Sequence, residues 1–409
     1  MAQAHARDTA PRRPWGLVFL LVLGMCISFF DRGNLAIAAP VLGPALGLST
    51  MQKGMLLSSF FWTYSVLLVV AGWLADRVQV KWLYAAGFLL WSLATLATAA
   101  MSTFAGLLVM RLLLGIGETV VYPCNGKILV NAFNEECRGL ANALTDLGSR
   151  LGPMMGNLLG GLLVAGIGWR GLFTATGATA LLWLVPWLLW APRIEIQSKS
   201  EPGDGSGWGE LLRRRDVWGT FIGLCGANYA WYFLLSWMPS YLADERHFTM
   251  KSVAVWGALP YLVMAVAQVN GGLMADRWIR AGRSAVPVRR GIMVAGLLFT
   301  AILLPLALLP RIEWAFAGIF IAFFAFGTYV SNLWALTQTL AGSRAVGRWT
   351  GMQNAFGNLA GIVSPILTGW LVSRTGSFRI AFVAASVACV IGAASFGLLV
   401  RTPSQVPAD

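Results

Sequence analysis

The chain has 409 residues, of which 57% are hydrophobic and only 11% are charged. Because a soluble domain carries about 25% charged residues, this composition excludes an ordinary soluble protein and indicates a chain that crosses a membrane many times. The net charge of +13 does not indicate nucleic-acid binding, because the basic residues lie mostly in short loops between apolar stretches, as is typical of membrane proteins.

The chain begins with a polar, basic segment, residues 1–14, which we expect to form a cytoplasmic tail. The apolar run from Trp15 to Pro40 is too long for the core of a signal peptide, and no convincing cleavage site follows it. We therefore expect this run to be retained as the first transmembrane helix.

Twelve apolar stretches follow one another, each near the length of about 20 residues that crosses a bilayer. Backbone groups in lipid must be hydrogen-bonded within their own segment, so each stretch is expected to be an α-helix. The predicted fold class is an all-α membrane protein with twelve transmembrane helices. These helices cover residues 15–40, 51–75, 82–101, 104–128, 139–164, 169–192, 216–243, 251–275, 291–310, 313–340, 349–373 and 378–401.

Residues 193–215 interrupt the apolar pattern with a charged segment that contains Pro202, several glycines and the run Arg213 to Arg215. This composition is typical of a flexible linker. It divides the chain into an N-terminal six-helix half, 15–192, and a C-terminal six-helix half, 216–401, which a cytoplasmic tail, 402–409, follows.

The distribution of Lys and Arg predicts the orientation in the membrane. These residues are concentrated in the N-terminal tail, the loop 76–81, the linker and the loop 277–290, and they are fewer in the alternate loops. Since cytoplasmic loops carry the excess of positive charge, we expect both termini to lie in the cytoplasm, with the chain in a cell inner membrane.

Two patterns of glycine and charged residues occur once in each half. The first comprises Gly72, Asp76 and Arg77, repeated as Gly272, Asp276 and Arg277. The second comprises Gly148, Gly152, Gly160, Arg170 and Phe173, repeated as Gly357, Gly361, Gly369, Arg379 and Phe382. Parallel six-helix repeats describe the major facilitator architecture, in which substrate binds near the midplane between the halves.

The loop from Gly72 to Lys81 resembles the signature loop that follows the second helix in the major facilitator superfamily, with Gln79 and Val80 departing from the family pattern. The resemblance implies a gating or salt-bridge role, in which helix-end charges hold the two halves together on the cytoplasmic side. The residues concerned are Asp76, Arg77, Asp276 and Arg277. The alternative is an ordinary positively charged cytoplasmic loop.

Two further segments are similar to one branch of this superfamily, the anion:cation symporters. The fourth predicted helix contains the run Arg111 to Glu118, followed by Tyr122 to Lys127, and the first helix contains the run Phe30 to Pro40. The branch includes bacterial sugar-acid permeases and, more remotely, sialin and the vesicular glutamate transporters. The resemblance covers nearly the whole chain and implies transport of an organic anion coupled to protons.

Charged side chains inside membrane helices are rare and usually face a cavity. The resemblance implies that Asp31 and Glu118 form a proton-coupling pair and that Arg32 lies close to the anion, with Arg111 in a gating or salt-bridge role. Both histidines lie outside the core, so a proton relay must use carboxylates. The alternative is a static network of salt bridges that holds the helices together.

The fifth predicted helix carries a second acid and base, Asp146 and Arg150, at a spacing that allows them to pair directly. Arg150 lies near mid-membrane and could bind a second carboxylate on the substrate, or the two charges could simply neutralise each other. Ser149 lies where the branch is expected to have a neutral polar residue.

The run from Gly148 to Gly156 is somewhat similar to a motif of drug/proton antiporters. Small residues at this spacing also allow close packing of helices, which is the reading that we favour.

The C-terminal half offers polar and aromatic side chains for a hydroxylated substrate: Tyr229, Tyr232, Asn332, Trp334, Asn354 and Asn358. Tyr64 and Tyr122 could add contacts from the N-terminal half. Each of these side chains could instead serve helix packing.

The sequence therefore predicts a secondary transporter, a proton-coupled symporter of a small organic anion such as an aldonate, aldarate or hexuronate. The alternatives are a proton-antiport exporter of drugs or metabolites and a membrane receptor or scaffold that transports nothing. The embedded arginines disfavour the cationic substrates of many exporters. We expect no enzymatic activity, no metal, no cofactor other than the coupling protons, and a monomer in the lipid bilayer.

Overall fold

The computed structural model describes residues 15–132, 135–191 and 208–401, and all the regular structure in these ranges is helical. The N-terminal group of helices comprises α1 (Trp15–Ala45), α2 (Thr50–Arg77), α3 (Val80–Thr98), α4 (Phe104–Glu118), α5 (Val121–Ala132), α6 (Glu135–Met155), the π-helical turn η1 (Gly156–Gly160) and α7 (Gly161–Trp190). The C-terminal group comprises α8 (Trp208–Arg213), α9 (Arg215–Ser240), the π-helical turn η2 (Tyr241–Glu245), α10 (Met250–Arg280), α11 (Ala285–Leu303), the 3₁₀ turn η3 (Leu304–Leu308), α12 (Ile312–Thr375) and α13 (Arg379–Leu399).

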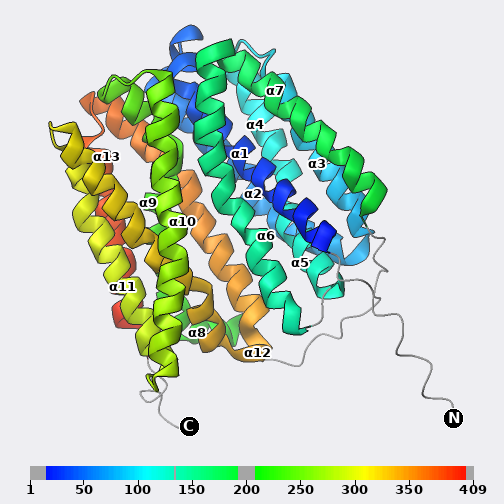
Figure 1. The fold of residues 1–409 in the computed structure, drawn as a ribbon, viewed down its shortest axis with the longest axis vertical. Coiled ribbons are helices and arrows are strands. Elements are labelled where there is room, and N and C mark those ends of the chain that lie inside the picture. Colours follow the sequence, from blue (N-terminus) through cyan, green and yellow to red (C-terminus); the bar gives the residue numbers. More distant parts are fainter. Residues whose placement is uncertain (1–14, 133–134, 192–207, 402–409) are drawn as a thin grey trace.

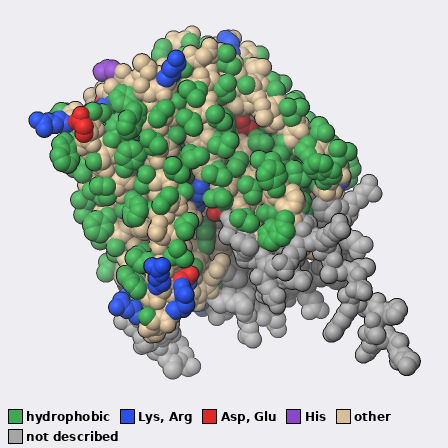
Figure 2. Space-filling model, in the orientation of Figure 1, with side chains coloured by type: hydrophobic (Ala, Val, Ile, Leu, Met, Phe, Trp, Pro, Cys, Tyr) green, Lys and Arg blue, Asp and Glu red, His purple; other side chains and the backbone are tan. Residues whose placement is uncertain are grey.

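The helices lie side by side in one bundle (Figure 1). In the part of the chain that the structure describes, nine helical stretches are long and apolar enough to cross a membrane. Hydrophobic side chains cover the middle of the face in Figure 2, whereas Lys and Arg lie mainly at its two ends. This arrangement is that of a multi-pass membrane protein.

The boundary predicted between residues 164 and 169 lies at Gly168. Its φ of 76° and ψ of 175° are not helical, and glycine adopts such positive φ values at little cost. The chain therefore bends within α7, and one of the nine apolar stretches, Leu144–Trp190, contains this bend.

The helix α12 is continuous where two helices, 313–340 and 349–373, were expected. The chain nevertheless reverses direction inside it. The evidence is a 2.8 Å hydrogen bond that the Thr337 hydroxyl donates to Gln353 Oε1, sixteen residues later in the sequence. In a straight helix, side chains this far apart in sequence would be about 24 Å apart. The predicted loop is thus a helical turn, and the predicted segments on either side of it run back along each other.

The linker predicted at 193–215 contains a short helix, α8, in its last part, whereas residues 193–207 lie outside the described ranges. Leu211 of α8 packs in a buried cluster with Val217, Phe221 and Trp349. The Arg214 guanidinium stacks over the Trp349 ring at 4.8 Å. This part of the linker is packed because it supplies one apolar side chain to the C-terminal group.

Contacts between the two groups gather at one end of the bundle. A side chain at Gly54 of α2 would place its Cβ 2.7 Å from the Pro365 carbonyl oxygen and 3.2 Å from Gly369 Cα of α12. Nearby, Lys53 Nζ lies 3.5 Å from Asp244 Oδ2 of η2. We call this end, which holds residues 45–50, 241–250 and 375–379, the closed end. Among the described residues, every hydrogen bond that joins the two groups lies either there or beside the cavity described below.

Glycines on α6 allow α1 to approach closely. A Cβ at Gly148 would lie 2.6 Å from Met25 Cβ, and one at Gly152 would lie 2.6 Å from Phe29 Cβ. These glycines therefore serve helix packing, as we expected, rather than a wall of the cavity.

Candidate functional site

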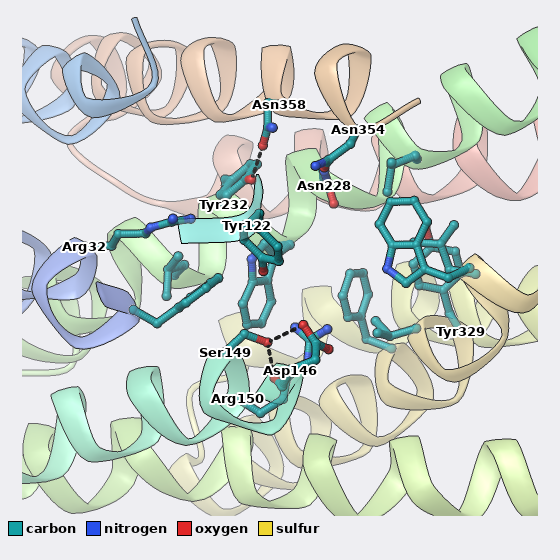
Figure 3. A pocket seen from close by; sticks show the side chains of 18 of the residues that line it. Arg32, Tyr122, Asp146, Ser149, Arg150, Asn228, Tyr232, Tyr329, Asn354 and Asn358 are labelled. Carbon is teal, nitrogen blue, oxygen red and sulfur yellow. Dashed lines mark hydrogen bonds between the residues drawn. The ribbon is translucent and has the colours of Figure 1, made fainter. Parts of the chain in front are cut away.

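A cavity of about 290 Å³ lies between the two groups of helices (Figure 3). Its walls come from α1, α2, α5 and α6 on one side and from α9 and α12 on the other. Ten residues predicted from the sequence line it: Arg32, Tyr64, Tyr122, Asp146, Ser149, Arg150, Tyr232, Trp334, Asn354 and Asn358. The cavity thus combines two arginines with one carboxylate and several hydroxyl and amide groups.

Arg32 is held in its place by aromatic rings. Its Cζ lies 4.3 Å from the centre of the Phe29 ring, 4.9 Å from that of Phe60 and 4.6 Å from that of Tyr64. Such cation–π contacts stabilise a guanidinium more strongly when it is shielded from water. One of its terminal nitrogens, Nη2, is buried and has no hydrogen bond to any described residue. The Arg32 side chain lines the cavity (Figure 3), and its Nη2 is a donor that an anion could use after a small shift of the side chain.

Glu118 lies behind Arg32 and is fully buried, without lining the cavity. Its Oε2 accepts hydrogen bonds from Arg32 Nε at 2.5 Å and from the Ser28 hydroxyl at 2.8 Å, whereas its Oε1 has no partner among the residues that the structure describes. Ser28 was missed from the sequence, although it precedes Arg32 by one helical turn and thus shares its face. Glu118 thus contacts Arg32, which lines the cavity, without reaching the cavity itself.

Asp31 faces a different environment from its neighbour Arg32, because consecutive residues point in different directions on a helix. It is 2% exposed, and its Oδ1 accepts a 2.9 Å hydrogen bond from Asn34 Nδ2, while Oδ2 accepts no hydrogen bond from the described part of the chain. It lies in the wall of an apolar groove formed by α1, α6, η1 and α7. The structure therefore does not bring Asp31 into the cavity with Arg32.

Arg111 does not form the salt bridge expected of it within the described residues. It is 6% exposed, and its guanidinium donates to two backbone carbonyl oxygens, those of Leu56 at 3.3 Å and Arg32 at 3.5 Å. These contacts hold α4 against α2 and α1. Arg111 thus supports the backbone around Arg32 rather than lining the cavity.

The direct pair expected between Asp146 and Arg150 is also absent among the described contacts. The Ser149 hydroxyl donates to the Asp146 carbonyl at 2.7 Å and to Asp146 Oδ1 at 3.3 Å (Figure 3). Arg150 instead extends across the interface, where its Nε donates to Gln268 Oε1 of α10 at 3.1 Å and its Cζ lies 5.9 Å from the Trp231 ring centre. Sequence spacing allowed the pair, but a partner on another helix takes its place.

The polar side chains of the C-terminal group divide between the cavity and the helix interfaces. The Tyr232 hydroxyl donates a 2.8 Å hydrogen bond to Asn358 Oδ1 at the cavity wall. Tyr229 and Asn332 do not line the cavity; the Asn332 amide donates to the Thr328 carbonyl and the Ser331 hydroxyl. Several lining residues, such as Trp231, Phe326 and Tyr329, were not predicted, because an aromatic residue in an apolar helix carries no signal of which face it occupies.

The helix-end charges do not join the two groups in the described structure. The side chain of Asp76 lies outside the described residues, and Arg77 stacks over the Trp73 ring of its own helix at 4.2 Å. Asp276 lies 3.6 Å from Arg289 of α11, within the C-terminal group, and Arg277 is exposed at the end of α10. Their gating role therefore stays a prediction.

Comparison with known proteins places these features in a family context. The sequence model of the Major Facilitator Superfamily matches residues 21–365. The chain is 30% identical to the probable sulfoacetate transporter SauU of Cupriavidus necator, over 91% of this chain and 92% of that protein. It is 29% identical to the hexuronate transporter of Bacillus subtilis, over 96% of both chains. It is 26% identical to the probable L-galactonate transporter of Escherichia coli, over 95% of this chain and 90% of that one.

Among solved structures, the chain is similar to a bacterial homologue of the human lysosomal transporter Spinster in an inward-facing, unoccupied conformation, with a TM-score of 0.81. The alignment covers 96% of this chain and 98% of the other at 20% identity. At this level of identity the similarity concerns the fold.

Proposed function

This chain belongs to the major facilitator superfamily and is therefore a membrane transporter rather than an enzyme, and we propose that it carries a small organic anion into the cell together with protons. The proposed substrate class is that of sugar acids and related carboxylates or sulfonates. Support comes from relatives named as transporters of hexuronate, L-galactonate and sulfoacetate and from the two arginines of the cavity.

The proposed architecture has twelve transmembrane helices in two six-helix halves, 15–192 and 216–401. The nine apolar stretches support it, because one of them contains the bend at Gly168 and two further long helices, α2 and α9, lie among them. The packing supports it as well. In the N-terminal group α1 packs on α6 and α3 on α7, and in the C-terminal group α9 packs on α12 and α11 on α13.

We further propose that both termini are cytoplasmic, in an inner membrane, and that the closed end faces the outside. The charge distribution of the loops supports this orientation. The protein would then act as a monomer and need no cofactor other than the coupling protons.

The observation that carries the proposal is the buried pair of Arg32 and Glu118 at the cavity wall. When Glu118 is ionised, it occupies one donor of Arg32 and partly neutralises its charge. When Glu118 takes up a proton, that competition ends, and the guanidinium offers its full charge and hydrogen-bonding fork to an anion. Anion binding and protonation therefore favour each other, which is the linkage that a symporter needs.

Asp31 is proposed as a second proton site. It is a buried carboxyl of α1, and one of its oxygens has no hydrogen-bond partner among the described residues. A buried, unpaired charge is unfavourable. Protonation of the Asp31 carboxylate would therefore stabilise the carrier while it changes from one conformation to the other.

Proton-antiport export is the competing function for the same fold. The proposal is tested with purified protein in liposomes, given a panel of labelled aldonates, aldarates, hexuronates and sulfoacetate. We expect that an inward proton gradient drives accumulation of one class and that a protonophore abolishes it. Accumulation that ignores the protonophore, or efflux down that gradient, would contradict symport.

A further inference from the structure

The cavity contains a second arginine, Arg150, whose charge the described structure leaves without an acid partner. Of its donors, only Nε has a hydrogen bond to described residues, and the acceptor is the neutral amide oxygen of Gln268. Asp146, one helical turn earlier, instead accepts a hydrogen bond from Ser149. The two terminal nitrogens of Arg150 are therefore available on the cavity wall.

An embedded cation that forms no direct ion pair with a described residue is unfavourable in a membrane protein and usually marks a binding function. The planar guanidinium suits carboxylate and sulfonate groups, because it donates two parallel hydrogen bonds. Arg150 is also held from two sides, by Gln268 and by the Trp231 ring, so its orientation is fixed before an anion arrives. A fixed donor loses less entropy on binding.

Arg32 and Arg150 approach the same cavity from different helices, α1 and α6. Tyr122 and Tyr232 line the cavity together with both arginines. The cavity of about 290 Å³ is close to the lower limit of small-molecule sites. One compact molecule could therefore contact both arginines at the same time.

We propose that the cavity selects dianions, with one anionic group of the substrate bound by Arg32 and the other by Arg150. This inference rests on the proposed function and narrows it from organic anions in general to molecules with two anionic ends. Arg150 is then a specificity-determining residue. A monoanion of the same size satisfies Arg32 but leaves Arg150 facing an uncharged group.

The test compares matched pairs of ligands by their stabilisation of purified protein against thermal unfolding, which reports binding. Galactarate and galactonate share a carbon chain and differ only in the second carboxylate, and sulfoacetate with acetate forms a shorter pair. Since a hydrogen bond to a charged group contributes about 1.5–3 kcal/mol, wild-type protein should prefer the dianion of at least one pair by about tenfold or more.

The variant Arg150→Gln should lose most of that preference and keep its affinity for the monoanion within about twofold, whereas Arg150→Lys, which keeps the charge, should retain part of it. Gln268→Ala is the matched control, because it removes the interhelical hydrogen bond but leaves the arginine. It should keep the preference for the dianion. Size-exclusion profiles identify any variant that fails to fold.

Three results would overturn the inference. The first is wild-type binding of monoanions as tight as that of dianions. The second is equal loss of both ligands in Arg150→Gln. The third is a Gln268→Ala variant that loses the preference for dianions as Arg150→Gln does. Arg150 would then serve only to hold α6 against α10. In each case the proposed transport of organic anions would stand, whereas a wild-type protein that binds no organic anion of the panel would contradict both proposals.

Discussion

At the scale of single residues, the proposed mechanism depends on Glu118 being able to change its charge. Glu118→Gln retains the shape of the side chain but cannot ionise, so it fixes one state of the pair with Arg32. We expect this variant to bind the anion and exchange it in counterflow, but to lose accumulation driven by a pH gradient. Retained accumulation with pH as the only driving force would show that Glu118 is not an obligatory proton site.

Ser28→Ala provides the control for that experiment. It removes the other hydrogen bond to the same carboxylate oxygen without removing a titratable group. We expect gradient-driven uptake to persist in Ser28→Ala, with a changed rate at most. Loss of coupling in both variants would assign the effect to disturbed packing rather than to the proton.

Arg32 is predicted to be irreplaceable even by another cation. Arg32→Lys keeps the positive charge but loses the planar fork that fits an anionic group and the hydrogen bond from Nε. We expect affinity to fall by about tenfold or more, measured as the concentration of anion that gives half-maximal thermal stabilisation. The corresponding change Arg111→Lys should lower stability more than affinity, because Arg111 contacts backbone carbonyls and does not line the cavity.

At the scale of helices, the close approach of α2 to α12 requires glycine. A methyl group at Gly54 would lie 2.7 Å from the Pro365 carbonyl oxygen, so Gly54→Ala should prevent the closed end from packing as it does here. We expect transport to fall strongly in Gly54→Ala while expression is retained. Gly351→Ala, on α12, has open space around it and should transport normally; a comparable loss in both variants would contradict a specific role of the closed end.

The helices themselves could be predicted from the sequence, because length and apolarity suffice to identify a membrane span. The helical conformation of the turn within α12 could not, since a helical turn and a loop have similar sequences.

The partners of side chains could not be predicted either. Spacing along α6 allowed Arg150 to pair with Asp146, but no pattern in the chain indicated that Gln268 on α10 lies within reach. Position on one helix predicts which residues share a face, whereas the identity of the facing helix comes only from the fold.

At the scale of the whole molecule, the two groups of helices meet at the closed end and enclose the cavity beside it. A carrier that works by alternating access must separate this end to exchange substrate with the other side. The contacts observed there include the glycine contact of α2 with α12 and the ion pair of Lys53 with Asp244. These contacts must break each time the closed end opens.

Which side the closed end faces decides whether the described state receives substrate from the cytoplasm or from outside, and labelling can determine it. Ser373 near the closed end and Ser284 near the opposite end are both exposed, and a cysteine replaces serine with little change in shape. In a variant without the native cysteines, we expect Ser373→Cys to react with a membrane-impermeant maleimide in intact cells. Ser284→Cys should react only after permeabilisation, because the basic loop that contains it is predicted to be cytoplasmic. The reverse labelling pattern would mean that the closed end faces the cytoplasm and that the termini lie outside. The proton linkage of Arg32 and Glu118 could then no longer be interpreted as uptake of the anion into the cell.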